Sequence, residues 1–215
     1  MIRIDCLKAL HGMLPADTLV VVTLGVTTDE FYDLGHREAT MYLPAMGCNT
    51  PVGLGLAMAL PQRRVLVLDS DGSLMMSLGI LTTVAAQAPR NLGVIVFDNQ
   101  CYESIGGSPT PSAAGADLTM IAKGAGIKDA ATVEDLASFR TAAQRALTAP
   151  GPVFVTARFQ PSIQRVTPKT TDIFEDKYHF VRYIERSEGV EILTPATRGR
   201  RDAQAWSPGA AKPSK

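Results

Sequence analysis

The sequence contains 215 residues, 46% of them apolar, which is enough to bury the core of one α/β domain with a short extension. Its 21 basic and 21 acidic side chains balance, so no net field would recruit nucleic acid or an anionic membrane. No membrane span or secretory signal is evident, and the three scattered cysteines, Cys6, Cys48 and Cys101, are typical of free thiols in a cytoplasmic protein.

The apolar pattern of the first half predicts helices and strands in alternation. An amphipathic helix within residues 1–17 precedes a buried strand at 19–24. Runs of branched apolar residues at 65–68 and 92–97 are typical of strands that are buried on both faces of a parallel sheet. The proline-free, almost wholly apolar segment 73–88 between them predicts one long crossover helix.

The second half continues the alternation. It predicts a short helix at 117–126, a strand near Ala130, a helix opened by a capping box of Thr132 with Asp135, and a last strand at 153–157. We therefore expect an α/β fold with a doubly wound, mainly parallel sheet and helices on both faces.

Composition divides the chain into three parts. Residues 1–160 form the expected domain, and 161–193 form a proline- and charge-containing arm with one helix at 172–186. Such an arm either packs on its own domain or clasps a partner subunit. Residues 194–215, rich in Arg, Pro, Ala, Gly and Ser, are expected to be disordered.

Hard oxygen donors collect where the two central strands end: Asp69, Asp71, Asp98 and Asn99. Ligands of open α/β sheets bind outside the carboxyl ends of the strands. Gly72 and Ser73 follow Asp71 at a helix start, where N–H groups and a hydroxyl suit an anion beside a divalent metal. The alternative is that these residues only form turns and helix caps.

The joint pattern of Asp-Gly-Ser at 71–73 and an asparagine 28 residues after Asp71 resembles the diphosphate-binding motif of thiamine-diphosphate enzymes. The resemblance implies thiamine diphosphate and Mg²⁺ as cofactors. The metal ligands would be the side chains of Asp71 and Asn99 and the main-chain carbonyl of Cys101. Ser70 stands where the family usually has glycine, and serine needs an ordinary backbone conformation there.

A second stretch resembles the same family. Met46-Gly precedes a small-residue helix, as in the family's Gly-Ser-Met-Gly, although the two residues before Met46 differ. By resemblance, Met46 would support the bent cofactor, while the carbonyl of Pro44 and the amide of Met46 bind its pyrimidine ring. The strand end with Gly25, Thr27 and Thr28 would also face the cofactor. Alternatively, Met46 only fills the core and Thr28 only caps a helix.

Substrate-facing candidates come from two loops. Tyr102 and Glu103 lie just beyond the proposed metal carbonyl, in a Gly-, Pro- and Ser-rich loop long enough to form an active-site wall. Tyr102 would also contact the cofactor. His36 and Arg37 are candidates of lower rank, because their loop could equally be solvated with a local ion pair. Arg37 is the cation expected to meet an anionic substrate.

Over residues 15–160 the chain looks most like the β subunit of sulfopyruvate decarboxylase and the C-terminal third of phosphonopyruvate decarboxylase. This resemblance implies a 2-oxo acid decarboxylase subunit in a hetero-oligomer, with a pyrimidine-binding α-type partner that carries the activating glutamate. The small 2-oxo acid substrate stays open. One alternative is an acetolactate-synthase-like carboligase subunit, and another is a non-catalytic thiamine-diphosphate-binding regulatory module. Neither a dinucleotide nor a Walker motif is present.

Overall fold

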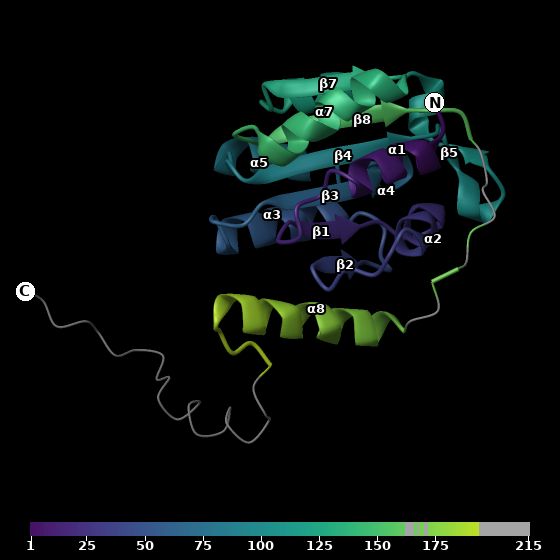
Figure 1. Ribbon diagram of the computed structural model, residues 1–215. Coiled ribbons are helices and arrows are strands. Elements are labelled where there is room, and N and C mark those ends of the chain that lie inside the picture. The colour runs from purple at the N-terminus through teal and green to yellow at the C-terminus, as the bar shows by residue number, and fades with distance from the viewer. Residues whose placement is uncertain (162–165, 167, 170–171, 194–215) are drawn as a thin grey trace, which may run out of the picture.

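A six-stranded parallel sheet forms the centre of the molecule (Figure 1). The structure is a computed structural model that describes residues 1–161, 166, 168, 169 and 172–193. The strand order is β2-β1-β3-β4-β8-β7, and each neighbouring pair is parallel. In chain order the strands are β1 (Leu19–Val22), β2 (Thr40–Tyr42), β3 (Val65–Ser70), β4 (Leu92–Asp98), β7 (Asp129–Val133) and β8 (Val153–Arg158).

Helices cover both faces of this sheet, and each face has its own apolar core. On one face lie α1 (Arg3–His11), α2 (Val26–Asp33) and α7 (Leu136–Thr148). On the other lie α3 (Asn49–Ala59), α4 (Asp71–Met75), α5 (Ile80–Gln87) and α6 (Leu118–Gly124). Because the strands are covered on both sides, their residues are almost all buried. The predicted α/β fold is confirmed.

The helix α8 (Ile173–Glu188) runs alongside β2, the edge strand of the sheet (Figure 1). Its buried side chains, Phe180 and Ile184, belong to the same apolar core as α3 and α5. A helix was predicted here, and it begins at the N-cap Asp172, whose carboxylate accepts the N–H of Phe174. The expectation for 194–215 lies outside the described residues. Among the described residues, no helix has both the length and the apolar character that crossing a bilayer requires.

The prediction of one crossover helix over 73–88 is wrong. The chain forms α4, leaves the α-helical pattern after Met75, and starts α5 at Ile80. In between, tighter i→i−3 hydrogen bonds replace the α-helical ones, such as those from Ser77 to Leu74 and from Ile80 to Ser77. The uniformly apolar sequence gave no sign of this break, since both short helices face the same core.

Two further details differ from the sequence prediction. The capping box of Thr132 with Asp135 is wrong, because Thr132 lies in β7 and only Asp135 caps α7, accepting the N–H groups of two residues in the first turn. The edge strand β2 follows the loop of His36 and Arg37 and was not predicted. This strand pairs with β1 over only three residues, too few to produce a periodic pattern.

The strand order places a crevice between the central strands β1 and β3. From β1 the chain passes to β2 on one side and then returns to β3 on the other side of β1. All strands point the same way, so their carboxyl ends meet at one edge, on the right in Figure 1. Ligands of doubly wound folds bind at such a switch point.

Candidate functional site

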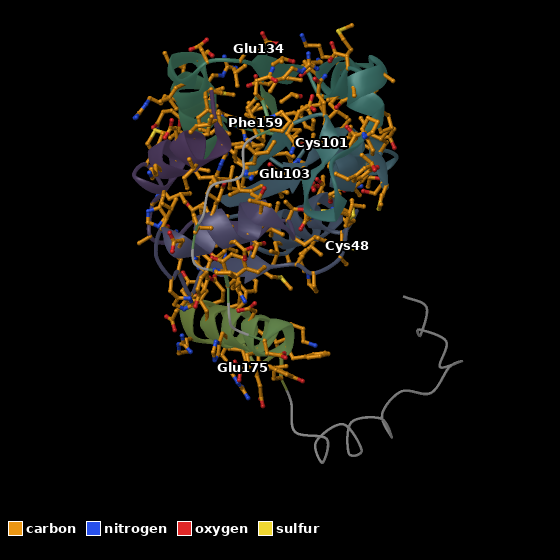
Figure 2. All side chains as sticks on the ribbon, turned by 90° about the vertical axis from the view of Figure 1, so that its right-hand side faces the viewer. Cys48, Cys101, Glu103, Glu134, Phe159 and Glu175 are labelled. Atoms are coloured by element: carbon orange, nitrogen blue, oxygen red, sulfur yellow. The ribbon has the colours of Figure 1, made fainter. Side chains whose placement is uncertain are left out.

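A cavity of about 630 Å³, counted up to its open mouth, lies at the carboxyl ends of β1, β3 and β4. Figure 2 faces this edge of the sheet and labels Cys101 and Glu103 there. Nine of the residues singled out from the sequence line the cavity: Gly25, Thr27, Met46, Asp71, Gly72, Asn99, Cys101, Tyr102 and Glu103. They come from segments far apart in sequence, so the fold brings the predicted candidates together at one place.

Asp71 begins α4 with only 1% of its surface exposed. Its Oδ2 accepts hydrogen bonds from Thr110 (2.6 Å) and Ser112 (3.2 Å). Burial raises the pKa of Asp71 to about 6, and the nearby charge of Asp98 adds to that effect, whereas the Thr110 hydrogen bond opposes it. A bound cation would favour the charged carboxylate here, because it would replace the lost solvation.

Asn99 and Cys101 lie in a tight turn directly after β4. The Oδ1 of Asn99 accepts the N–H of Cys101 (3.2 Å), and Gln100 between them adopts a left-handed conformation (φ 63°) that is uncommon for a residue other than glycine. A carboxylate, an amide oxygen and main-chain carbonyls at one place are the hard donors that Mg²⁺ prefers. In the described part of the chain, no three His, Cys, Asp or Glu side chains form a metal cluster. The donor set fits magnesium.

Gly72 allows Tyr102 to lie directly against the start of α4. A β-carbon on Gly72 would come within 2.4 Å of Cε1 of the Tyr102 ring, well below contact distance. Gly25, at the end of the β1 segment, has φ 86°, which favours glycine. These two positions explain why small residues occur at the cavity, where backbone must approach closely.

Ser70 and Ser73 stabilise the start of α4 through hydrogen bonds. Ser70 has an extended backbone (φ −119°, ψ 158°), the ordinary conformation expected for it, and its Oγ accepts the N–H of Ser73. Ser73 is fully buried, and its Oγ accepts hydrogen bonds from Gly47 N (3.0 Å) and Asn49 Nδ2 (3.1 Å). Ser73 does not line the cavity; it ties the loop that carries Met46 to α4.

Thr28 and Pro44 line a neighbouring cavity, which shares Gly25 with the first. The hydroxyl of Thr28 donates to the carbonyl of Thr23 (2.5 Å), so it closes the turn between β1 and α2. Pro44 is exposed. Of the two residues predicted to bind the pyrimidine ring, Pro44 therefore lines the neighbouring cavity and Met46 lines the main one.

His36 and Arg37 line neither of these cavities. His36 is exposed and packs edge-on against Tyr32, with ring centroids 6.4 Å apart. The guanidinium of Arg37 donates to main-chain carbonyls of the turn before β1: Pro15, Ala16 and Thr18. Arg37 thus has a structural role in holding that turn, and the described conformation brings neither residue to Asp71.

Two other strand-end carboxylates serve the fold. Asp69 is fully buried and accepts hydrogen bonds from Thr50 (2.8 Å) and Asn49 (3.2 Å), which attach the start of α3 to β3. Asp98 is also fully buried and accepts from Ser112 (2.7 Å) and Arg158. Neither lines the cavity. Of the four oxygen donors noticed at the strand ends, only Asp71 and Asn99 do.

Arg3 is a cavity residue that the sequence analysis did not identify. It stands at the start of α1, is 3% exposed, and forms ion pairs with Glu30 (2.7 Å) and Glu103 (2.8 Å). Its guanidinium also lies over the ring of Phe159. An arginine at the start of an amphipathic helix normally points to solvent, so no sequence signal distinguished it.

Residues 26–157 match the family model described as thiamine pyrophosphate enzyme, C-terminal TPP binding domain. The chain belongs to this family. It is 40% identical over 160 residues to phosphonopyruvate decarboxylase of Streptomyces viridochromogenes, covering 74% of this chain but 40% of that protein. It is 36% identical over 183 residues to the sulfopyruvate decarboxylase subunit beta of Methanothermobacter thermautotrophicus, covering 85% of this chain and 95% of that subunit.

Among solved structures, benzoylformate decarboxylase from Polynucleobacter necessarius superimposes with a TM-score of 0.61 at 20% identity, over 79% of this chain and 34% of that one. At this identity the likeness shows the shared fold. The chain spans about two fifths of the length of the phosphonopyruvate decarboxylase but nearly the whole length of the β subunit. In extent it therefore corresponds to that β subunit.

Proposed function

We propose that this chain is the cofactor-binding subunit of a thiamine-diphosphate- and Mg²⁺-dependent 2-oxo acid decarboxylase, of the sulfopyruvate and phosphonopyruvate type. The observation that carries the proposal is the match to a sulfopyruvate decarboxylase subunit beta over 95% of that subunit's length. The cavity supports it, because the predicted metal donors and the close-packed glycines meet there.

In this proposal Asp71 and Asn99 hold the magnesium ion through their side chains, and Cys101 through its carbonyl. The main chain at Gly72 would bind the diphosphate at the start of α4, and Met46 would support the rings of the cofactor. Thiamine diphosphate would supply a nucleophilic carbon and an electron-accepting ring for the loss of carbon dioxide. Ser73 contributes indirectly, since it fixes the Met46 loop by accepting the Gly47 N–H.

The walls of the cavity suit the loss of a carboxylate. Leu24, Val26 and Phe97 line it with apolar side chains, and Tyr102 covers the start of α4. An apolar, water-poor wall favours a step in which charge is dispersed. In this proposal Tyr102 and Glu103, which line the cavity, contact the substrate.

The charged residues of the cavity indicate which charged groups a partner subunit would have to supply. The charged residues that line the cavity are Arg3, Asp71 and Glu103, and Arg3 is already paired with two carboxylates. Among the residues that the structure describes, a substrate with a second anionic group would find no uncompensated cation on this cavity wall. We therefore propose that an α-type partner subunit supplies the cation for the substrate as well as the activating glutamate. Assembly in the cytoplasm stays a prediction.

The test is reconstitution with a pyrimidine-binding subunit in the presence of thiamine diphosphate and Mg²⁺. Carbon dioxide release would be measured with sulfopyruvate, phosphonopyruvate and pyruvate in parallel. Faster turnover of one of the two C3-anionic substrates than of pyruvate is expected. Formation of an acetolactate-type product from pyruvate, with no net preference for an anionic substrate, would contradict the decarboxylase assignment in favour of a carboligase.

A further inference from the structure

Arg3 connects three segments at the edge of the cavity. Its Nε and Nη2 donate to the two oxygens of Glu30 on α2 (2.7 and 3.3 Å), and its Nη1 donates to Oε2 of Glu103 (2.8 Å). The side chains of the three residues are 4%, 0% and 9% exposed, respectively. Buried ion pairs of this kind are costly to break, because removal of one partner leaves an uncompensated charge.

The balance of charge argues against direct anion binding by Arg3. One guanidinium faces two carboxylates, so the cluster has a net negative charge. Three of its five N–H groups are engaged by those carboxylates. A diphosphate or a sulfonate would have to compete with both. The arrangement suits a residue that positions Glu103, which itself lines the cavity.

Glu103, which Arg3 holds in place, in turn orients the side chain of Asn99. The same Oε2 that accepts from Arg3 also accepts from Nδ2 of Asn99, at 3.4 Å. On its other side, Oδ1 of Asn99 accepts the N–H of Cys101. The amide group is therefore held at both ends, with its nitrogen toward Glu103 and its oxygen toward the turn that carries the proposed metal carbonyl. If the amide turned over, both hydrogen bonds would be lost.

The unpaired state of the second carboxylate oxygen of Glu103 is an independent observation that points to a bound ligand. Within the described residues, Oε1 of Glu103 is buried and has no hydrogen-bond partner, although the side chain lines the cavity. A buried oxygen without a partner is unfavourable until a donor meets it. Arg3 holds Oε2 in place, so Oε1 is left available to an N–H or O–H donor on a bound ligand.

We propose that Arg3 is a positioning residue for the cofactor site: through Glu103 it orients the Asn99 amide as a magnesium ligand and keeps Oε1 of Glu103 available to bound ligand. This inference rests on the proposed function. It predicts that Arg3 affects magnesium affinity without touching the metal.

The test is calorimetric titration of Mg²⁺ into the full chain at saturating thiamine diphosphate, with folding checked by urea unfolding. Arg3→Met is expected to weaken Mg²⁺ binding about tenfold. Arg3→Lys, which keeps the charge but cannot bridge both carboxylates, is expected to lie between Arg3→Met and the wild type. It is also the variant to use if Arg3→Met does not fold.

The matched control is Arg64→Met. Arg64 is a half-buried arginine, which donates to the carbonyls of Ala146 and Ala149 at the opposite, amino-terminal end of β3. The Arg64→Met substitution is expected to lower stability while leaving Mg²⁺ affinity within about twofold of the wild type. Any equal effect of Arg64→Met and Arg3→Met on affinity would overturn the inference, since general destabilisation would then explain both.

A double-mutant cycle with Glu103→Ala tests whether Arg3 affects Mg²⁺ binding through Glu103. If Arg3 acts through Glu103, the double variant should bind Mg²⁺ no more weakly than Glu103→Ala alone. Losses that multiply, or a folded Arg3→Lys with wild-type affinity, would overturn the inference while the proposed function stands. Absence of magnesium-dependent cofactor binding by the wild-type chain, beside its partner as well as alone, would instead contradict the proposed function.

Discussion

The carboxylate of Asp71 occupies a position that lowers the stability of the cofactor-free chain. It is buried, its pKa is raised to about 6 by loss of solvation, and two hydroxyls support only one of its oxygens. At neutral pH the folded chain must hold a charge there that the unfolded chain holds in water. In the proposed function, Asp71 therefore serves binding at the expense of stability.

Replacing Asp71 by asparagine should therefore have opposite effects on stability and binding. The metal-free chain should become more stable at pH 7 by about 1–3 kcal/mol, because each pKa unit corresponds to about 1.4 kcal/mol. Affinity for thiamine diphosphate with Mg²⁺ should fall at least tenfold, or about 1.4 kcal/mol. Urea unfolding without ligand and calorimetry with ligand measure the two effects. Unchanged cofactor binding would remove Asp71 from the metal site.

Gly72 gives a second prediction at the residue scale. In Gly72→Ala the new methyl group would displace the Tyr102 ring, which is 2.4 Å from the ideal β-carbon position. Cofactor affinity is expected to fall about tenfold, with a stability loss of roughly 1–2 kcal/mol. Gly79→Ala is the matched control, since nothing lies within 4 Å of its β-carbon. Cofactor titration of both variants distinguishes them, and equal affinities would mean that Tyr102 moves aside at no cost.

At the scale of elements, the sequence predicted what periodicity and strand-end chemistry can encode. The central strands β1, β3, β4 and β8 were found because buried parallel strands have uninterrupted apolar runs. The break between α4 and α5 was missed because both short helices bury apolar residues in the same core, so the sequence stays apolar across the break. Short elements such as β2 have too few residues to show a period.

The contact between α1 and α2 should make the fold sensitive to acid. His11 packs edge-on against Phe31 (5.9 Å), and burial, together with the nearby charge of Arg37, lowers the pKa of His11. Because the folded-state pKa lies below the unfolded value, its contribution to stability is present above about pH 6.5 and is lost as the pH falls. His11→Gln should thus lose less stability between pH 7 and 5 in urea titrations. Parallel pH profiles for both proteins would contradict this role.

The packing of α8 leads to a prediction about the arm. Phe180 is 3% exposed within the core that α3 and α5 share, whereas Tyr178 on the same helix is 48% exposed. Phe180→Ala should lower the free energy of unfolding by about 3 kcal/mol, and Tyr178→Ala by less than about 0.5 kcal/mol. Urea unfolding compares them. If the two losses were equally small, the alternative that this helix serves mainly to clasp a partner would be favoured.

At the scale of the whole molecule, the candidate site is assembled from the strand ends and from a helix that the site motifs do not include. The sequence indicated the proposed metal donors because their spacing is local to β3, β4 and the turns after them. It did not indicate Arg3, which reaches Glu103 over 100 residues of chain. Long-range pairs of this kind are set by how α1 and α2 pack on the sheet, and one sequence contains no record of that packing.

The same view leads to the last prediction, which concerns the need for a second subunit. The cavity opens at one edge of the sheet, and its lining, as far as the described residues form it, offers no uncompensated cation for an anionic substrate. The purified chain alone is thus expected to bind thiamine diphosphate with Mg²⁺ but to release no carbon dioxide from a 2-oxo acid. Adding a pyrimidine-binding subunit should restore activity in proportion to the complex formed, levelling off once this chain is saturated. Mass photometry would follow assembly, and a carbon dioxide assay would follow turnover in the same samples. Turnover by the isolated chain at a rate that the partner does not improve would show that this chain carries a complete active site.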